Sequence, residues 1–171
     1  WVFGVNGYDY TFLGTTVGYD KQDGNNTDGM AFTIQQGSIG SDNSEGDTDH
    51  TTISVSKYQS RKLAEGIQTT LTGSFALTNV DSSRKVKFAS IDRTATASYN
   101  SVAFDGAVEY AYSPRQLFGA AHNLSLQGGI TLNFQEGFTE SGANALNLKV
   151  DSSQTQVARA DLVDTIYWSG N

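Results

Sequence analysis

Residues 102–112, VAFDGAVEYAY, alternate between two kinds of side chain with a period of two. One set is Val102, Phe104, Val108, Tyr110 and Tyr112, and the other is Asp105, Ala107, Glu109 and Ala111. Successive side chains of a β-strand point to opposite faces of the sheet. This stretch therefore predicts a strand with one face of large apolar residues and one face of small or acidic residues.

The same period recurs about eight times along the chain, between clusters of polar residues and glycine. We expect strands at Trp1–Gly7, Tyr10–Tyr19, Met30–Gly40, His50–Tyr58, Ile67–Leu77, Ala95–Tyr112, Leu124–Phe134 and Thr155–Trp168. The last strand carries Val157 and Val163 and has aromatic residues at its end. No stretch of comparable length has helical periodicity, so the sequence predicts an all-β, antiparallel fold.

The length of these strands favours a membrane barrel over a soluble sandwich. Strands of roughly 9–11 residues cross a bilayer at a tilt, whereas soluble strands average about 5–6 residues. The second face of each strand carries mainly Gly, Ala, Ser and Thr, which suits a wet or narrow barrel interior. A sandwich would bury large residues there instead.

Composition excludes several classes of function. The 171 residues carry a formal net charge of -7 and no cysteine. The chain therefore has no basic surface to neutralise nucleic-acid phosphates, and neither a disulfide nor a thiolate zinc site can form. It contains neither an apolar run of about 18 residues nor a signal peptide, so we expect a mature or trimmed chain.

The expected connections alternate in length along the chain. The shorter set is 21–29, 59–66 and 113–123, and the mostly longer set is 41–49, 80–94 and 137–154. Short turns on one side and long loops on the other are typical of bacterial outer-membrane barrels. Aromatic residues near strand ends suit the girdles of such barrels; these are Tyr8, Tyr10, Tyr19, Tyr58, Tyr99, Tyr110, Tyr112, Tyr167 and Trp168.

Three phrases of the sequence resemble the β-barrel translocator domain of bacterial autotransporters, the type V secretion family. The first is GYDY at 7–10, followed by a strand ending VGYD at 17–20. The second is TATASY at 94–99, followed by the strand through Glu109 to Tyr112. The third and most specific is GFTESGANALNL at 137–148. The phrases come in family order and cover nearly the whole chain.

The resemblance implies an up-and-down transmembrane barrel of about twelve strands in the bacterial outer membrane. About eight strands are expected here, so residues 1–171 would be one barrel domain, the N-terminal two-thirds, incomplete at its C-terminus. Its partners would be the lipid bilayer, lipopolysaccharide, the barrel-insertion machinery and a passenger domain of the same polypeptide, which the barrel anchors and helps to export. No nucleic acid, cofactor, metal or enzymatic activity is expected.

Asp105, Glu109 and Arg159 are the candidate lumen-facing polar residues. Asp105 and Glu109 are expected on one face of one strand, and Glu109 matches a lumen-facing Glu of the family. Such carboxylates would line the pore, pair with an inward arginine such as Arg159, or contact a threaded segment. The alternative, which we favour, is that they are structural polar residues of a wet lumen.

Other polar clusters are weaker candidates. Asp47 and Asp49 flank His50, as at the rim of some outer-membrane proteases, although a polar loop explains them better. Residues 23–29 fail the calcium-loop pattern, because position 12 is Ile34 rather than Glu. The loop containing Arg84, Lys85 and Lys87 could meet lipopolysaccharide phosphates, but a solvated hairpin is favoured. No G-x-S-x-G nucleophile motif is present.

Two alternatives remain open from the sequence. A small closed barrel of eight strands, acting as an adhesin or structural anchor, would pair Thr155–Trp168 with Trp1–Gly7. A soluble β-sandwich binding module would bury the large apolar residues of its strands, which include Leu124, Leu126, Ile130 and Leu132.

Overall fold

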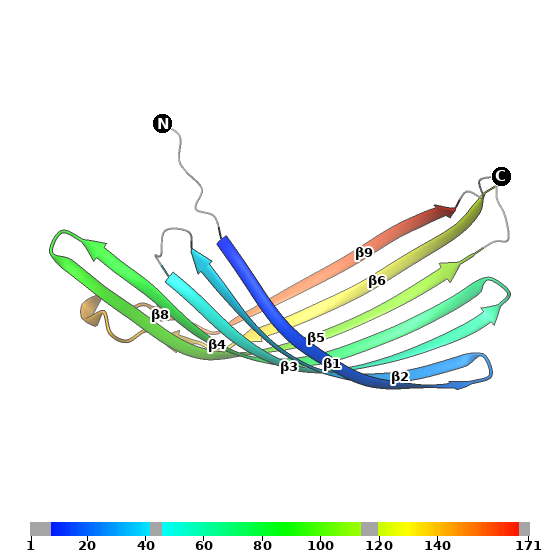
Figure 1. Cartoon of the computed structure of the whole chain (residues 1–171), viewed down its shortest axis with the longest axis horizontal. Coiled ribbons are helices and arrows are strands. Elements are labelled where there is room, and N and C mark those ends of the chain that lie inside the picture. The colour runs from blue at the N-terminus through cyan, green and yellow to red at the C-terminus, as the bar shows by residue number, and fades with distance from the viewer. Residues whose placement is uncertain (1–7, 42–45, 114–119, 168–171) are drawn as a thin grey trace.

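The structure is a computed structural model that describes residues 8–41, 46–113 and 120–167. Its main element is one antiparallel sheet of seven long strands, in which each strand lies beside its neighbours in sequence (Figure 1). The strands are β1 (Tyr8–Asp23), β2 (Asn26–Ser41), β3 (Gly46–Ala64), β4 (Ile67–Phe88), β5 (Ile91–Tyr112), β6 (Ala121–Gln135) and β9 (Ser153–Tyr167).

The connection between β6 and β9 carries three short elements. They are β7 (Phe138–Thr139), the 3-10 helix η1 (Asn144–Leu146) and β8 (Lys149–Val150), with β7 and β8 paired to each other. Within the described ranges, no helix is both long enough and apolar enough to cross a membrane.

The predicted fold class is confirmed, and seven of the eight predicted strands lie where the sequence placed them. The eighth, Trp1–Gly7, lies outside the described residues. The strands are longer than expected, at 15 to 22 residues each.

The expected connection at 80–94 is wrong, because β4 and β5 run through it as a continuous hairpin. Val80 pairs with Tyr99, and pairing continues outward until Phe88 faces Ile91 across a two-residue turn. The apolar alternation ends near Leu77, but backbone pairing between β4 and β5 continues beyond it to Phe88 and Ile91. Ser, Thr and β-branched residues continue the ladder where the apolar pattern stops.

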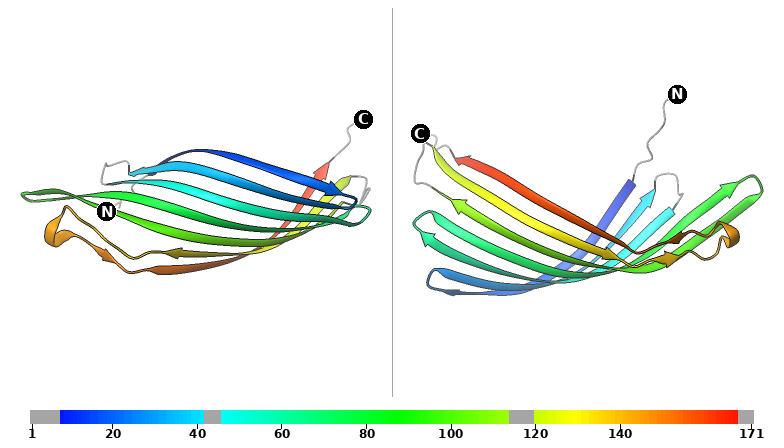
Figure 2. Two further views of the ribbon diagram at one scale, coloured as in Figure 1. Left: turned by 90° about the horizontal axis from the view of Figure 1, so that it is seen from below. Right: turned by 180° about the vertical axis from the view of Figure 1, so that it is seen from behind.

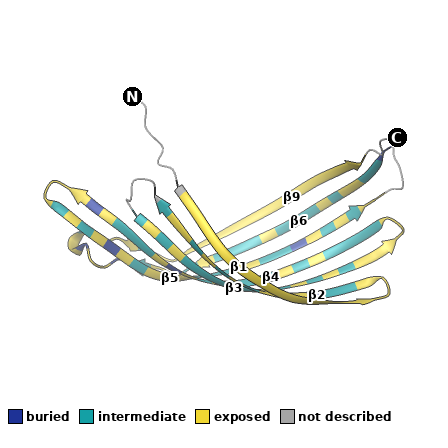
Figure 3. Cartoon of the chain, viewed as in Figure 1, coloured by how far each residue is buried: buried dark blue, intermediate teal, exposed yellow. Residues whose placement is uncertain are grey.

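The sheet is strongly curved (Figures 1 and 2), and its two faces differ in chemistry. We call the face that carries Ser54 and Asp105 the inner face and the face that carries Val55 and Phe104 the outer face. Along β3, β4 and β5 the inner-face side chains are the less exposed set (Figure 3). Side chains on a concave surface shield one another, so the inner face is the concave one.

This distribution is the reverse of that in a water-soluble sheet. On the outer face, Leu71 is 60% exposed, Phe104 is 46% exposed and Val108 is 53% exposed. In the described part of the chain no large side chain is fully buried. A soluble protein rarely exposes so broad an apolar surface, whereas a membrane strand turns such a surface to lipid.

Strand register assembles the outer-face residues into an apolar belt, which Lys57 interrupts on β3. One complete row across six strands is Val17, Phe32, Val55, Phe75, Phe104 and Leu132. Toward the β4–β5 turn the belt ends at a polar row made of Gln36, Thr51, Asn79 and Asn100. The amide of Asn79 donates to the side-chain oxygen of Asn100 at 3.2 Å, which continues the polar row across two strands.

The belt runs obliquely across the strands. It occupies Leu13–Tyr19 on β1 and Leu124–Phe134 on β6, whereas register places Leu13 and Tyr19 in the rows of Glu136 and Ile130. Its centre therefore shifts by about four residues over five strand spacings, which corresponds to a strand tilt of roughly 30°. Tilted strands of this kind are typical of membrane barrels.

The predicted aromatic girdle is only partly correct. Tyr19, Tyr110 and Tyr112 lie on the outer face, at the end of the belt away from the β4–β5 turn. The inner face instead carries Tyr10, Tyr58, Tyr99 and Tyr167. Position near a strand end does not fix the face of a side chain, because the face alternates at each residue. The side chain of Tyr8, and Trp168, lie outside the described residues.

The pairing of Gly29 with Tyr58 predicts a stability effect. The Tyr58 ring covers Gly29 and its hydroxyl donates to Asp20 at 3.3 Å, so a Cβ at position 29 would overlap the ring. We expect Gly29→Ala to lower the free energy of unfolding by about 1–3 kcal/mol. Gly106→Ala is the control, since no atom lies within 4 Å of a Cβ there. Urea unfolding of the refolded protein measures both, and equal losses would contradict the packing described.

Candidate functional site: the polar inner face and its rim

Two carboxylates on the inner face of β5 are each held by a hydroxyl group from β6. The Thr131 hydroxyl donates to Asp105 at 2.6 Å, and the Ser125 hydroxyl donates to Glu109 at 2.5 Å. Asp105 and Thr131 are direct cross-strand partners. The inner face of β5 therefore presents two acidic groups, four residues apart, whose donors come from the next strand.

Arg159 reaches Asp105 from β9, across the whole width of β6. Its Nη1 donates to Asp105 Oδ2 at 3.2 Å and its Nη2 to Asp105 Oδ1 at 3.5 Å. The side chain passes over Gly129, where a Cβ would lie 3.2 Å from Arg159 Nε and 3.1 Å from the Gly106 carbonyl oxygen. Gly129 therefore leaves the space through which the arginine crosses β6.

All three sequence candidates thus lie on one part of the inner face, and the suggested partnership of Arg159 is formed with Asp105. Sequence reasoning missed Gly129, although the Gly128-Gly129 pair inside a strand was a signal, because glycine in a strand often marks a close approach. The side chains of Arg159 and Asp105 are 41% and 26% exposed. An ion pair this accessible to solvent contributes little to stability.

On the inner face of β1 to β4, hydroxyl groups of neighbouring strands pair with one another. The side-chain oxygens of Thr16 and Thr33 lie 2.8 Å apart, as do those of Thr52 and Thr78. These pairs give part of the β1–β4 inner face a lining of hydroxyl groups. Asp20 of β1, which accepts a hydrogen bond from the Tyr58 hydroxyl, adds a carboxylate to the same face.

At the rim beyond the polar row, Glu140 anchors the connection between β6 and β9. Arg84 Nε donates to Glu140 Oε1 at 3.0 Å and Arg84 Nη2 to Oε2 at 2.5 Å. The backbone amide of Leu148 also donates to Oε2, at 2.7 Å. These hydrogen bonds, first those from Arg84 and then the one from Leu148, hold the pKa of the Glu140 carboxyl below its usual range.

A small dry cluster lies beside this ion pair. It consists of Val86, Ala95 and Ala143, with Leu146 packed against it. Arg93 donates to the carbonyl oxygen of Ala143 at 3.2 Å. The β6–β9 connection is therefore packed against the inner side of the β4–β5 hairpin. Family resemblance picked out its sequence, but nothing in the spacing predicted its partner Arg84, 56 positions away.

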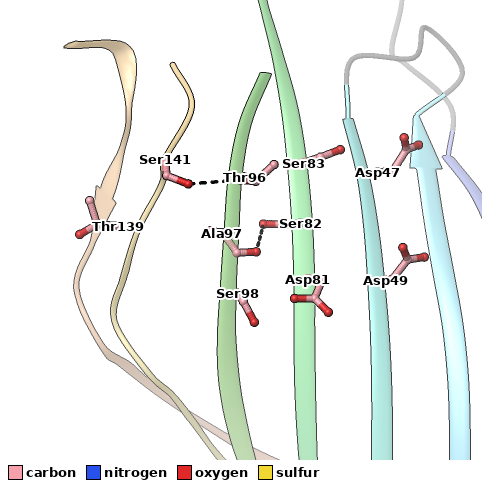
Figure 4. A pocket seen from close by; sticks show the side chains of 10 residues that line it. All are labelled: Asp47, Asp49, Asp81, Ser82, Ser83, Thr96, Ala97, Ser98, Thr139 and Ser141. Atoms are coloured by element: carbon pink, nitrogen blue, oxygen red, sulfur yellow. Dashed lines mark hydrogen bonds between the residues drawn. The ribbon is translucent and has the colours of Figure 1, made fainter. Parts of the chain in front are cut away.

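His50 and its neighbouring aspartates point to opposite faces of the sheet. Asp47 and Asp49 lie on the outer face and, with Asp81, line an open pocket at the rim (Figure 4). His50 faces inward, where its ring stacks on that of Tyr10 at 5.9 Å between centroids. Because these residues lie in strand β3 rather than in the expected loop, alternation places the imidazole and the two carboxylates on opposite faces.

The other polar clusters also belong to the strands. Residues 23–29 lie at the end of the β1–β2 hairpin, where Gly24 and Asn25 form the turn and Gly24 has a φ of 57°. Of the three basic residues near position 85, Arg84 is held by Glu140 on the inner side, whereas Lys85 and Lys87 lie on the outer face. Across the described residues, no group of three or more His, Asp or Glu side chains is placed to hold a metal ion.

The path of Arg159 predicts different effects at two adjacent glycines. Gly129→Val would push the arginine away from Asp105 and crowd the Gly106 carbonyl, at a cost of about 1–3 kcal/mol. Gly128→Val is the matched control, because Gly128 lies on the outer face and no atom stands within 4 Å of its Cβ position. Thermal and urea unfolding compare the two variants. A larger loss in Gly128→Val would refute the assigned faces.

The lowered pKa of Glu140 predicts how the rim responds to acid. A carboxyl with a depressed pKa in the folded state adds stability above its unfolded pKa, and loses it as pH falls through the folded pKa. Protection of residues 138–148 from amide exchange should therefore persist through mildly acidic pH and fall only below the ordinary range of a glutamate. In Glu140→Gln, protection should be low and independent of pH. Unchanged protection in this variant would contradict the anchoring role.

Comparisons with known proteins agree with this arrangement. The family model described as "Autotransporter beta-domain" matches residues 2–162. A solved structure, the translocator domain of the autotransporter NalP from Neisseria meningitidis, matches with a TM-score of 0.81 and 15% identity over 97% of this chain. The chain spans 57% of that structure. No curated protein matches the chain. The matched residues, the antiparallel sheet and its apolar outer belt lead to one conclusion: the chain belongs to the autotransporter beta-domain family and is part of a β-barrel of the bacterial outer membrane.

Proposed function

We propose that this chain forms part of the wall of a translocator, which anchors a passenger domain in the outer membrane and helps to export it. One observation carries the proposal: the large side chains of the sheet are exposed on the outer face, and the small polar ones line the inner face. The outer face suits lipid and the inner face suits a hydrated route for a polypeptide.

The residues of the inner wall suit the passage of a polypeptide rather than catalysis. Asp105 and Glu109 are each occupied by a hydroxyl donor, and Asp105 also by Arg159. General acid–base catalysis would need a group placed to exchange a proton with a substrate. We therefore propose that the chain has no enzymatic activity, and that these three residues give the wall a hydrated, charged lining.

Two further partners are proposed. Lys85 and Lys87 lie on the outer face of the β4–β5 hairpin beyond the apolar belt, where lipopolysaccharide phosphates could contact them. The barrel-insertion machinery is the second partner, because an apolar belt this exposed needs a route into the bilayer that avoids water. The apolar belt supports this second proposal.

The two alternatives differ in how the structure bears on them. The sandwich interpretation required Leu124, Leu126, Ile130 and Leu132 to be buried. The first three are 38%, 55% and 49% exposed in a single sheet, and Leu132 is only partly buried. For the closed eight-strand barrel, the proposed partner Trp1–Gly7 lies outside the described residues. Among the strands described, β9 pairs only with β6, and β1 only with β2.

A pair of adjacent substitutions tests the membrane assignment. Phe104→Arg places a charge on the outer face, which should cost about 2–4 kcal/mol near the bilayer midplane. Ala103→Arg points into the lumen and should be tolerated. We expect Phe104→Arg to lower the fraction of intact protein that is membrane-inserted and heat-modifiable on gels. In a soluble protein, replacing a side chain that is 46% exposed would cost almost nothing, so equal behaviour would contradict the proposal.

The export function is tested in the same cells by adding protease outside them. The N-terminal passenger should be cleaved in the wild type and in Ala103→Arg, and should stay protected in Phe104→Arg. A passenger that reaches the surface without an inserted barrel would overturn the proposed role in export.

A further inference from the structure

Strand β5 continues beyond the end of its neighbour β6. The last pair between them joins Ser101 to Gln135, whereas β5 extends outward to Ile91. One side of the segment Ile91–Asn100 is paired with β4. Its other side lacks β6, so the backbone groups on that side would form an open sheet edge at the mouth of the barrel.

The β6–β9 connection takes up this edge. The amide of Glu136 donates to the carbonyl oxygen of Asn100 at 2.9 Å, and its carboxylate accepts from the Asn100 backbone and side-chain amides at 3.2 and 2.9 Å. Farther out, Thr96 and Ser141 exchange two backbone hydrogen bonds of 2.9 Å, and the connection runs alongside β5 there (Figure 4).

Side-chain contacts hold the connection against the edge. The rings of Phe138 and Tyr99 stack at 4.5 Å between centroids, and Arg84 holds Glu140. Glu140 is 9% exposed and is the one buried charged residue in the described segments. Ala143 is fully buried against the β4–β5 hairpin. These contacts make the connection a fixed part of the rim.

The connection therefore leaves much less of the β5 edge beyond β6 open to another strand. β7 pairs with β8 in a separate two-stranded sheet, and β8 has two residues, Lys149 and Val150. Proteins protect themselves against unwanted strand addition by keeping edge strands very short or covering them with a loop. Both devices are present here.

We propose that residues 136–150 act as an edge guard, which prevents a polypeptide leaving the pore from adding to β5 as an extra strand. This inference rests on the proposed export function. An unfolded chain passing an open edge is the substrate that strand addition captures, because main-chain hydrogen bonds form whatever its sequence. A captured passenger would stall at the mouth. The guard therefore serves release of the passenger rather than its entry.

The test removes the guard in the intact protein and then blocks the uncovered edge. In one variant a short Gly/Ser linker replaces residues 137–150; in a milder one Glu140→Ala releases the anchor. Both should form a heat-modifiable barrel but display less protease-accessible passenger. The amide of Thr96, which the loss of Ser141 uncovers, should then be protected from exchange only when the passenger is present.

Thr96→Pro supplies the rescue. Proline removes the amide that an added strand would need and is tolerated on an edge that faces away from its neighbour. Added to either variant, it should restore passenger display. Wild-type display from barrels without the guard, or a stall that Thr96→Pro does not relieve, would overturn the edge guard. A wild-type barrel that displays no passenger would instead contradict the proposed export function.

Discussion

The continuous antiparallel hydrogen-bond ladder from β1 to β9 is the constraint on which the rest of this structure depends. The described residues contain no fully buried large side chain, so a dry interior core cannot hold the sheet together. The ladder does this instead, and it also satisfies backbone groups that could find no water in a bilayer. Its register transmits the period of each strand to the next, so that Val55, Phe75 and Phe104 meet on the same face. The outer belt and the inner wall are two consequences of this single alignment.

Different interactions select the side chains in the belt and in the outer part of the sheet, near the β4–β5 turn. Within the belt, lipid selects the side chains of one face. Beyond the polar row at Asn79 and Asn100, both faces meet water, and local packing takes over, as in the cluster around Ala143 and the ion pair of Glu140 with Arg84. The first region positions a hydrated wall, and the second shapes the mouth through which a passenger would leave. In the proposed function, the belt region holds the sheet in the bilayer and the outer region shapes the exit for the passenger.

The sequence predicted the strands well and their ends poorly. Alternation in 102–112 placed Asp105 and Glu109 on one face because the period of a strand is fixed. It could not show that β4 and β5 continue through 80–94, since apolar alternation reports lipid contact, whereas backbone pairing does not require it. Arg159 was a plausible partner on charge alone. The space at Gly129 depends on the register between β6 and β9, and the contact of Arg84 with Glu140 depends on how the β6–β9 connection folds back. Neither can be read from the residues near these positions in the sequence.

Because the central claim is that lipid covers one face of this sheet and water the other, residue-by-residue accessibility tests it most directly. Single nitroxide labels at positions 102 to 112 of the intact protein, reconstituted in vesicles, would be probed with oxygen, which partitions into lipid, and with a water-soluble nickel chelate. The account predicts a period of two in both signals with opposite phases: oxygen contact should peak at even positions such as Phe104, and nickel contact at odd positions such as Asp105. Signals that rise and fall together, or oxygen maxima at the odd positions, would contradict it.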